Sequence, residues 1–163
     1  EGFFPLPEPL ILKNISRVMS LRDGTKKMSK SEDSDYSRIN LRDNEEEIIK
    51  KIKKAKSDSE VIPDNLKSLE NKPEAFNLLN IYSEVSKINI EKVLKEMSGK
   101  EYSFLKNKLA DLLVSEICPV GKKIAKLMND KTYLLEILKK GSEKARIRAE
   151  ENLKNIREKV GLI

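Results

Sequence analysis

A succession of amphipathic helical segments fills the sequence after residue 43, and this pattern restricts the possible folds more than any other feature. The first segment opens with Asn44, three residues before Glu47, which is the spacing of a capping box. Glutamates fill its first turn and lysines its last, matching the helix dipole, and Ile48 and Ile52 belong to its apolar stripe. The pattern predicts a helix over residues 44 to 56.

Further helical segments follow to the end of the chain. Caps, breakers and apolar spacing predict that they begin at Pro73, Asn89, Ser103, Asp130 and Ser142. Pro119 should kink or break the third of these before Val120, and Gly141 should separate the last two. Together these segments predict a mainly α fold, with a helical bundle as its principal part.

The first 36 residues have a different pattern. An apolar stretch from Leu10 to Leu21 indicates one strand, and the residues Arg22 to Thr25 form a turn-rich cluster. A polar and basic loop then continues to about Asp35. The sequence therefore predicts a helical bundle joined to the end of a fold that contains a strand.

The composition excludes several classes of active site. The chain has no histidine, so a catalytic triad with histidine and an imidazole metal site are both impossible. Cys118 is the single cysteine, which rules out an internal disulfide and favours a reducing, cytoplasmic location. With 163 residues, of which 38% are apolar, the chain can form a core of modest size.

Charge and hydropathy indicate an anionic partner and no membrane. The 33 basic residues against 27 acidic ones give a net charge of +6. No apolar run approaches the roughly 18 to 20 residues that span a bilayer, and three prolines interrupt the first nine residues. Because the chain starts at Glu1, we expect it to be a piece of a longer protein.

The stretch from Gly24 to Ser31 carries the clearest chemistry. Three ammonium groups, on Lys26, Lys27 and Lys30, lie within five residues after a glycine, so the loop can bring several charges to a polyphosphate leaving group. The hydroxyls of Ser29 and Ser31 add donors, and Met28 offers an apolar face for a nucleotide base. The alternative is an exposed basic loop without a role.

The exact sequence of this loop favours a phosphate-binding role over an exposed loop without a role. Lys27-Met28-Ser29-Lys30-Ser31 is the KMSKS signature of class I aminoacyl-tRNA synthetases. The signature and its flanking segments, in this order, resemble the tryptophanyl-tRNA synthetase family. These segments are Arg17 to Lys26 before the signature, and Ser37 to Leu41, Ile48 to Ser59 and Lys72 to Tyr82 after it. The segment after Gly141 is also similar, so the resemblance covers essentially the whole chain.

The resemblance implies an ATP site in the loop. Lys27 and Lys30 are expected to hold the phosphates of ATP and to stabilise the transition state, with Ser29 and Ser31 beside them. Val18 matches the family's adenine-contacting position at the end of the last Rossmann strand, with Met19 and Met28 next to it; simple core packing is the alternative. Lys26 is expected to be a flanking surface charge. Mg²⁺ is expected to arrive with ATP, without a protein ligand or a metal site in this chain.

The resemblance also implies a domain division and an incomplete enzyme. Residues 1–36 correspond to the end of the Rossmann catalytic domain, and residues 37–163 to the helical domain that binds the tRNA anticodon, with packing of the last helix back on the catalytic fold as one option. The family's first signature contains histidine and cannot occur here. We therefore expect a C-terminal half that does not form tryptophanyl-adenylate alone.

The last helix is the expected contact with RNA. Lys144, Arg146 and Arg148 lie off its apolar face and are candidates for binding tRNA(Trp). Taken residue by residue, a solvated helix explains them better, and only their clustering and the family resemblance favour RNA. The lysines that end the 44–56 helix are expected to be solvated. With its missing half, the enzyme is expected to be a cytoplasmic homodimer that acts on ATP, tryptophan and tRNA.

Two alternatives remain open at the level of the sequence. The chain could belong to a tyrosyl-tRNA synthetase, which shares the subclass and also ends its catalytic fold in a helical domain. It could also be a stand-alone helical RNA-binding module, which accounts for the basic tail but gives the Lys27 to Ser31 loop no purpose.

Overall fold

A computed structural model describes residues 3–10 and 17–163, and in this part of the chain the fold is mainly helical, as the sequence predicts. The chain divides into two compact units, residues 1–121 and residues 122–163. The expected boundary after residue 36 falls inside the first unit, so the assignment of residues 1–36 and 37–163 to two domains stays a prediction.

Helix α1 (Glu45–Lys54) begins as its capping pattern predicts. The Asn44 side chain accepts the backbone N–H of Glu47 at 2.9 Å, and the Glu47 carboxylate accepts the backbone N–H of Asn44 at 2.8 Å. These two bonds satisfy donors that a helix N-terminus otherwise leaves unpaired. The apolar stripe follows, and Ile48 and Ile52 are fully buried.

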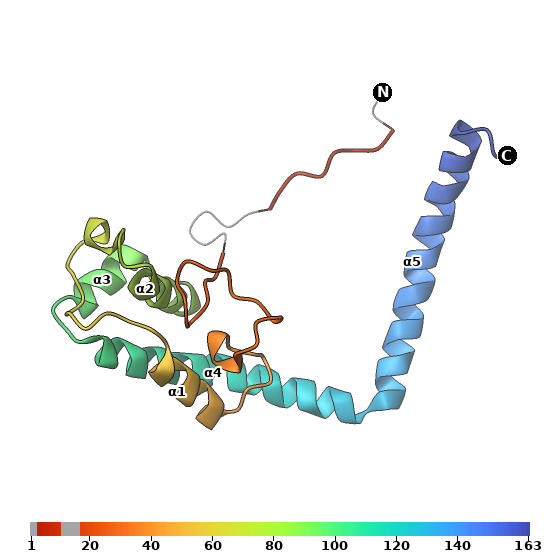
Figure 1. Ribbon diagram of the computed structural model, residues 1–163. Helices are drawn as coiled ribbons and strands as arrows, with labels where there is room; N and C mark the ends of the chain where they lie inside the picture. Colours follow the sequence, from red (N-terminus) through yellow and green to blue (C-terminus); the bar gives the residue numbers. More distant parts are fainter. Residues whose placement is uncertain (1–2, 11–16) are drawn as a thin grey trace. The chain divides into compact units, whose positions relative to one another are not determined.

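The next two helices also begin where the sequence indicates. Helix α2 (Pro73–Ser86) has Pro73 in its first turn and ends at Lys87, whose positive φ closes the helix. Helix α3 (Ile90–Met97) is capped by the Asn89 side chain and packs against α2 (Figure 1). Two short 3-10 helices, η1 (Asp35–Ser37) and η2 (Leu66–Leu69), lie in the connections.

Helix α4 (Tyr102–Asn129) differs from the expectation at its start and in its middle. It begins one residue before Ser103, which therefore lies inside the helix and does not cap it. It also continues through Pro119, so of the two options predicted there, a kink or a break, the break is wrong. The proline removes the N–H that would bond the carbonyl of Ser115, but Ser115 is exposed and water can satisfy that group.

Helix α5 (Lys131–Lys159) is a second correction. Asp130 caps it as predicted, with the Tyr133 N–H donating to the aspartate side chain at 3.0 Å. However, the helix runs without interruption through Gly141 and Ser142, where two separate helices were expected. A glycine inside a helix costs only about 1 kcal/mol relative to alanine, and the strong helix formers on both sides outweigh this cost.

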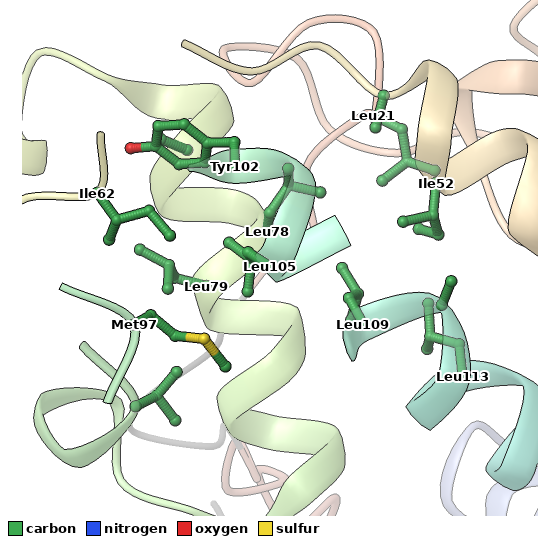
Figure 2. Packing of buried hydrophobic residues seen from close by; sticks show 14 of the residues in the cluster. Leu21, Ile52, Ile62, Leu78, Leu79, Met97, Tyr102, Leu105, Leu109 and Leu113 are labelled. Carbon is green, nitrogen blue, oxygen red and sulfur yellow. The ribbon is translucent and has the colours of Figure 1, made fainter. Parts of the chain in front are cut away.

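The buried core lies in the first unit and joins α1, α2, α3 and the first half of α4 (Figure 2). Leu78 and Leu79 of α2 meet Leu105 of α4, and Met97 closes the α3 side. Leu21, from the segment before the basic loop, reaches the same core and is only 1% exposed. The base of the loop is therefore fixed to the helical core.

The strand expected over Leu10 to Leu21 takes another form in the described residues. Leu10 and the stretch from Arg17 to Leu21 contain no strand, and a single antiparallel bridge joins Met19 to Lys27. Residues 11–16 of the prediction lie outside the described residues. A strand needs a neighbour to pair with over several residues, and within the described part of this segment the one backbone bridge is between Met19 and Lys27.

Candidate functional site

The candidate site is the basic loop, whose two arms run side by side. Met28 donates its backbone N–H to the carbonyl of Val18 at 3.0 Å, and Ser20 donates to the carbonyl of Lys26 at 2.8 Å. These bonds flank the Met19–Lys27 bridge and make a short antiparallel ladder. The structure thus brings the predicted nucleotide-contacting residues Val18, Met19 and Met28 next to Lys27.

The tip of the ladder is a tight turn organised by Asp23. Its carboxylate accepts the backbone N–H of Thr25 at 3.0 Å and the hydroxyl of Thr25 at 2.6 Å. These bonds lower the pKa of Asp23, and the Lys26 ammonium lies 3.4 Å from the same carboxylate. Lys26 therefore has a partner within the turn.

The first turn of helix α2 packs closely against this tight turn. A Cβ built on Gly24 would lie 2.5 Å from the backbone of Pro73 and Glu74, so only glycine allows this approach. Glu74 is also held in place, because the Lys56 ammonium donates to its carboxylate at 2.7 Å and lowers its pKa. Figure 1 shows the loop segment, in red and orange, beside α2.

Asn77 is the second contact of α2 with the loop. Its side chain accepts the backbone N–H of Met19 at 3.1 Å and donates to the carbonyl of Met19 at 2.8 Å. The asparagine is only 4% exposed, and the two residues after it are the core leucines Leu78 and Leu79. The sequence-based predictions missed it; the one available signal was a polar residue directly before Leu78 and Leu79.

The two lysines of the signature face solvent. Lys27 and Lys30 are both exposed, and neither ammonium makes an ion pair within the described part of the chain. The hydroxyls of Ser29 and Ser31 lie 2.9 Å apart, and Ser31 donates its backbone N–H to Ser29 at 3.3 Å. Met28 is half-buried against the core. Two positive charges are thus available to an anion on a loop whose apolar side is anchored.

An ion-pair cluster holds the chain after the loop. The Lys51 ammonium lies 2.6 Å from Asp43 and 2.5 Å from Asp35, and Lys51 is only 4% exposed. Arg38 adds a second cation to Asp35 at 2.9 Å, and Asn40 donates its backbone N–H to Asp43 at 2.8 Å. Burial works against the Lys51 charge, but the two carboxylates raise its pKa overall. The expectation that all α1 lysines are solvated is therefore wrong for Lys51.

The candidate RNA-binding residues are exposed on α5. Lys144, Arg146 and Arg148 all face solvent, and Arg146 lies 3.7 Å from Glu150 one turn away. The second unit, residues 122–163, contains 12 basic and 6 acidic residues. It therefore carries a charge of +6, equal to that of the whole chain, and the first unit is neutral.

A pocket of about 650 Å³ lies away from the loop, between the connection after α1 and the first turns of α4. Its lining mixes acids, bases and hydroxyls and includes none of the predicted site residues. In the described ranges, 3–10 and 17–163, no cluster of three or more potential metal ligands occurs. No helix in these ranges is both long and apolar enough to cross a membrane.

Comparisons with known proteins agree on one family. The family model for class I tRNA synthetases (W and Y) matches residues 1–117. The tryptophan–tRNA ligase of Brucella melitensis is 48% identical over 161 residues, which are 99% of this chain and 45% of the relative. That of Rickettsia felis is 47% identical over 160 residues, 97% of this chain and 47% of the relative. The chain thus spans about half the length of these relatives.

Solved structures give the same result. The tryptophanyl-tRNA synthetase of Campylobacter jejuni, in complex with ADP and tryptophan, matches 98% of this chain and 48% of its own, with a TM-score of 0.67 and 27% identity. The Mycoplasma pneumoniae tryptophanyl-tRNA synthetase matches 71% of this chain and 36% of its own, with a TM-score of 0.60 and 30% identity.

Proposed function

The chain belongs to the class I tRNA synthetases of the tryptophan and tyrosine group, and from this premise we propose that it supplies the ATP-binding loop and the tRNA-binding helices of a tryptophan–tRNA ligase. The complete enzyme activates tryptophan with ATP and transfers it to tRNA(Trp). The observation that carries the proposal is the KMSKS loop itself, with Lys27 and Lys30 exposed and without carboxylate partners in the described chain.

In the proposed reaction, a carboxylate oxygen of tryptophan attacks the α-phosphorus of ATP. A new P–O bond forms, the bond to the bridging oxygen breaks, and that oxygen leaves with its electron pair as part of pyrophosphate. Lys27 and Lys30 bind the β- and γ-phosphates and stabilise the charge that grows on them. Electrostatic stabilisation of this kind commonly makes the greatest single contribution to the rate of phosphoryl-type transfer. Mg²⁺ enters as part of the ATP complex.

The remaining loop residues are proposed to bind the rest of the nucleotide. Val18, Met19 and Met28 lie together on the ladder and offer apolar and backbone groups to the adenine base. The hydroxyls of Ser29 and Ser31 bond one another at 2.9 Å and can exchange this bond for one to a phosphate oxygen. Lys26, paired with Asp23, is proposed to stay outside the reaction.

The chain contains no histidine, so the histidine-containing first signature of the family cannot occur in it, and we propose that the amino-acid pocket also lies outside this sequence. We therefore propose that residues 1–36 belong to the catalytic fold and residues 37–163 to the helical, anticodon-binding part. The chain alone should not make the adenylate. A cytoplasmic homodimer is proposed for the complete enzyme.

Contact with tRNA is proposed for the basic second unit. Lys144, Arg146 and Arg148 are exposed on a helix in a unit of charge +6, which suits a phosphate backbone. Binding that depends on these residues should weaken as salt is raised, because phosphate contacts release counterions.

A chimera tests the proposal directly. The 161 matching residues of the Brucella melitensis ligase are replaced by this chain, and tryptophan-dependent exchange of pyrophosphate into ATP is measured. We expect exchange by the chimera and none by this chain alone. A folded chimera that binds tRNA but shows no exchange would favour the RNA-binding module and contradict the proposal.

A further inference from the structure

Asn77 is a polar residue buried in α2 together with the apolar residues Ala75, Leu78 and Leu79. It is 4% exposed and is followed by Leu78 and Leu79, which are 1% and 0% exposed. A buried carboxamide destabilises a protein unless its donor and its acceptor are both bonded. Here the acceptor and one donor bond go to Met19, which lies 58 positions earlier in the chain, and Nδ2 also donates a longer bond, of 3.5 Å, to the carbonyl of Ser20.

The two bonds continue the ladder of the loop. In an extended segment, successive residues turn their N–H and C=O groups to opposite edges. Val18 and Ser20 bond the Lys26–Met28 arm on one edge, and Met19 bonds Asn77 on the other. The asparagine side chain thus takes the place of a neighbouring strand, and the segment from Val18 to Ser20 is hydrogen-bonded along both of its edges.

The first turn of α2 holds the loop at a second place. Gly24 at the tip of the ladder rests on the backbone of Pro73 and Glu74, at a distance that leaves no space for a Cβ atom. The base and the tip of the ladder are therefore both set by the same helix. Lys27 lies directly opposite Met19, the residue that Asn77 holds.

We propose that Asn77 is a positioning residue: by bonding both backbone groups of Met19, it sets the location of Lys27 and of the nucleotide-contacting segment relative to α2. The inference rests on the proposed function and deepens it. It makes helix α2 a determinant of ATP binding although the Asn77 side chain touches no part of the substrate. A misplacement of about 1 Å far from the reacting atoms can cost about a hundredfold in rate.

The test replaces Asn77 by aspartate in the chimera. Asn77→Asp keeps the shape and one acceptor but removes the donor to Met19 and places a carboxylate against its carbonyl oxygen. Asn80→Asp is the matched control, because it makes the same chemical change one turn along α2 at a residue whose side chain has no hydrogen bond in the described chain. Gly24→Ala is the second variant, since it separates the ladder from α2 without changing a polar group.

We expect Asn77→Asp and Gly24→Ala to raise the KM for ATP by at least about fivefold in pyrophosphate exchange, with the KM for tryptophan within about twofold and Asn80→Asp unchanged. A merely structural role would reduce the amount of folded enzyme, and hence the apparent kcat, without moving the KM for ATP. An unchanged KM for ATP in folded Asn77→Asp enzyme overturns the proposal.

Hydrogen exchange on the 163-residue chain separates this inference from the proposed function. The amides of Ser20 and Met28 should exchange at least about tenfold faster in Asn77→Asp than in Asn80→Asp, because the ladder loses one of its edges. If the wild-type chimera is inactive, the proposed function fails, while the exchange rates still decide whether Asn77 holds the ladder. Equal rates in both variants would refute the positioning role.

Discussion

Replacing Lys51 by methionine is predicted to destabilise the first unit strongly. The Lys51 ammonium lies 2.6 Å from Asp43 and 2.5 Å from Asp35, and Lys51 and Asp43 are 4% and 8% exposed. Methionine preserves helix propensity and much of the side-chain volume, so the main change is the loss of one buried charge. The substitution leaves Asp43 buried without its cation.

The contacts that Asp43 keeps determine how much stability the substitution is expected to cost. Breaking a buried ion pair by removing one partner costs about 3 to 5 kcal/mol. Asp43 still accepts two hydrogen bonds from Asn40, at 2.8 and 3.2 Å, which offset part of its desolvation. We therefore expect a loss of about 3 kcal/mol in the free energy of unfolding, at the lower end of that range.

The assay is urea denaturation followed by tyrosine fluorescence. Tyr36, Tyr82 and Tyr102 all lie in residues 1–121, so the signal reports mainly on the first unit. Lys53→Met is the matched control, because Lys53 is exposed on the same helix, and it should change stability by less than about 0.5 kcal/mol. Adding Asp43→Asn to Lys51→Met should recover at least about 1 kcal/mol. A loss below about 1 kcal/mol for Lys51→Met would refute the buried-pair reasoning.

Two further predictions concern α5 and acid stability. Gly141→Ala should increase the helical signal in circular dichroism and stabilise α5 by about 0.5 to 1 kcal/mol, because an added Cβ meets no atom within 4 Å; a lower helical signal would contradict a continuous helix. Stability should also fall as the pH drops below about 4, because the Lys51 hydrogen bond lowers the pKa of Asp35 in the folded state, and this stabilisation is lost as Asp35 is protonated. Urea titrations across pH should show a smaller acid loss in Lys51→Met, and an equal loss would contradict the assignment.

Local signals in the sequence were sufficient for the short helices. The capping box at Asn44, Pro73 at the start of α2 and Asn89 before α3 each act within one turn, so they can be recognised without a fold. The same signals misled at Pro119 and Gly141. A single breaker is tolerated where the surrounding residues favour a helix and the freed groups stay in solvent.

The role proposed for the loop could also be inferred from the sequence, since the KMSKS residues are adjacent in it. The residues that hold the loop and the chain after it could not be inferred in the same way. Asn77 bonds a residue 58 positions away. Lys51 is one of five lysines between residues 50 and 56, and nothing local indicates that it alone among them is buried. Both are polar residues whose surroundings are created only when distant segments pack together.

The most direct measurement of the central claim is the rate of pyrophosphate exchange in the chimera with Lys27 and Lys30 both replaced by alanine. At saturating tryptophan, the double variant should lose at least about a thousandfold in kcat/KM for ATP, because both charges that we propose to stabilise the leaving pyrophosphate are removed. Lys26→Ala, which alters the cation paired with Asp23, should stay within about threefold of the parent chimera. A folded double variant that retains more than about a tenth of the parent activity would contradict the role assigned to this loop.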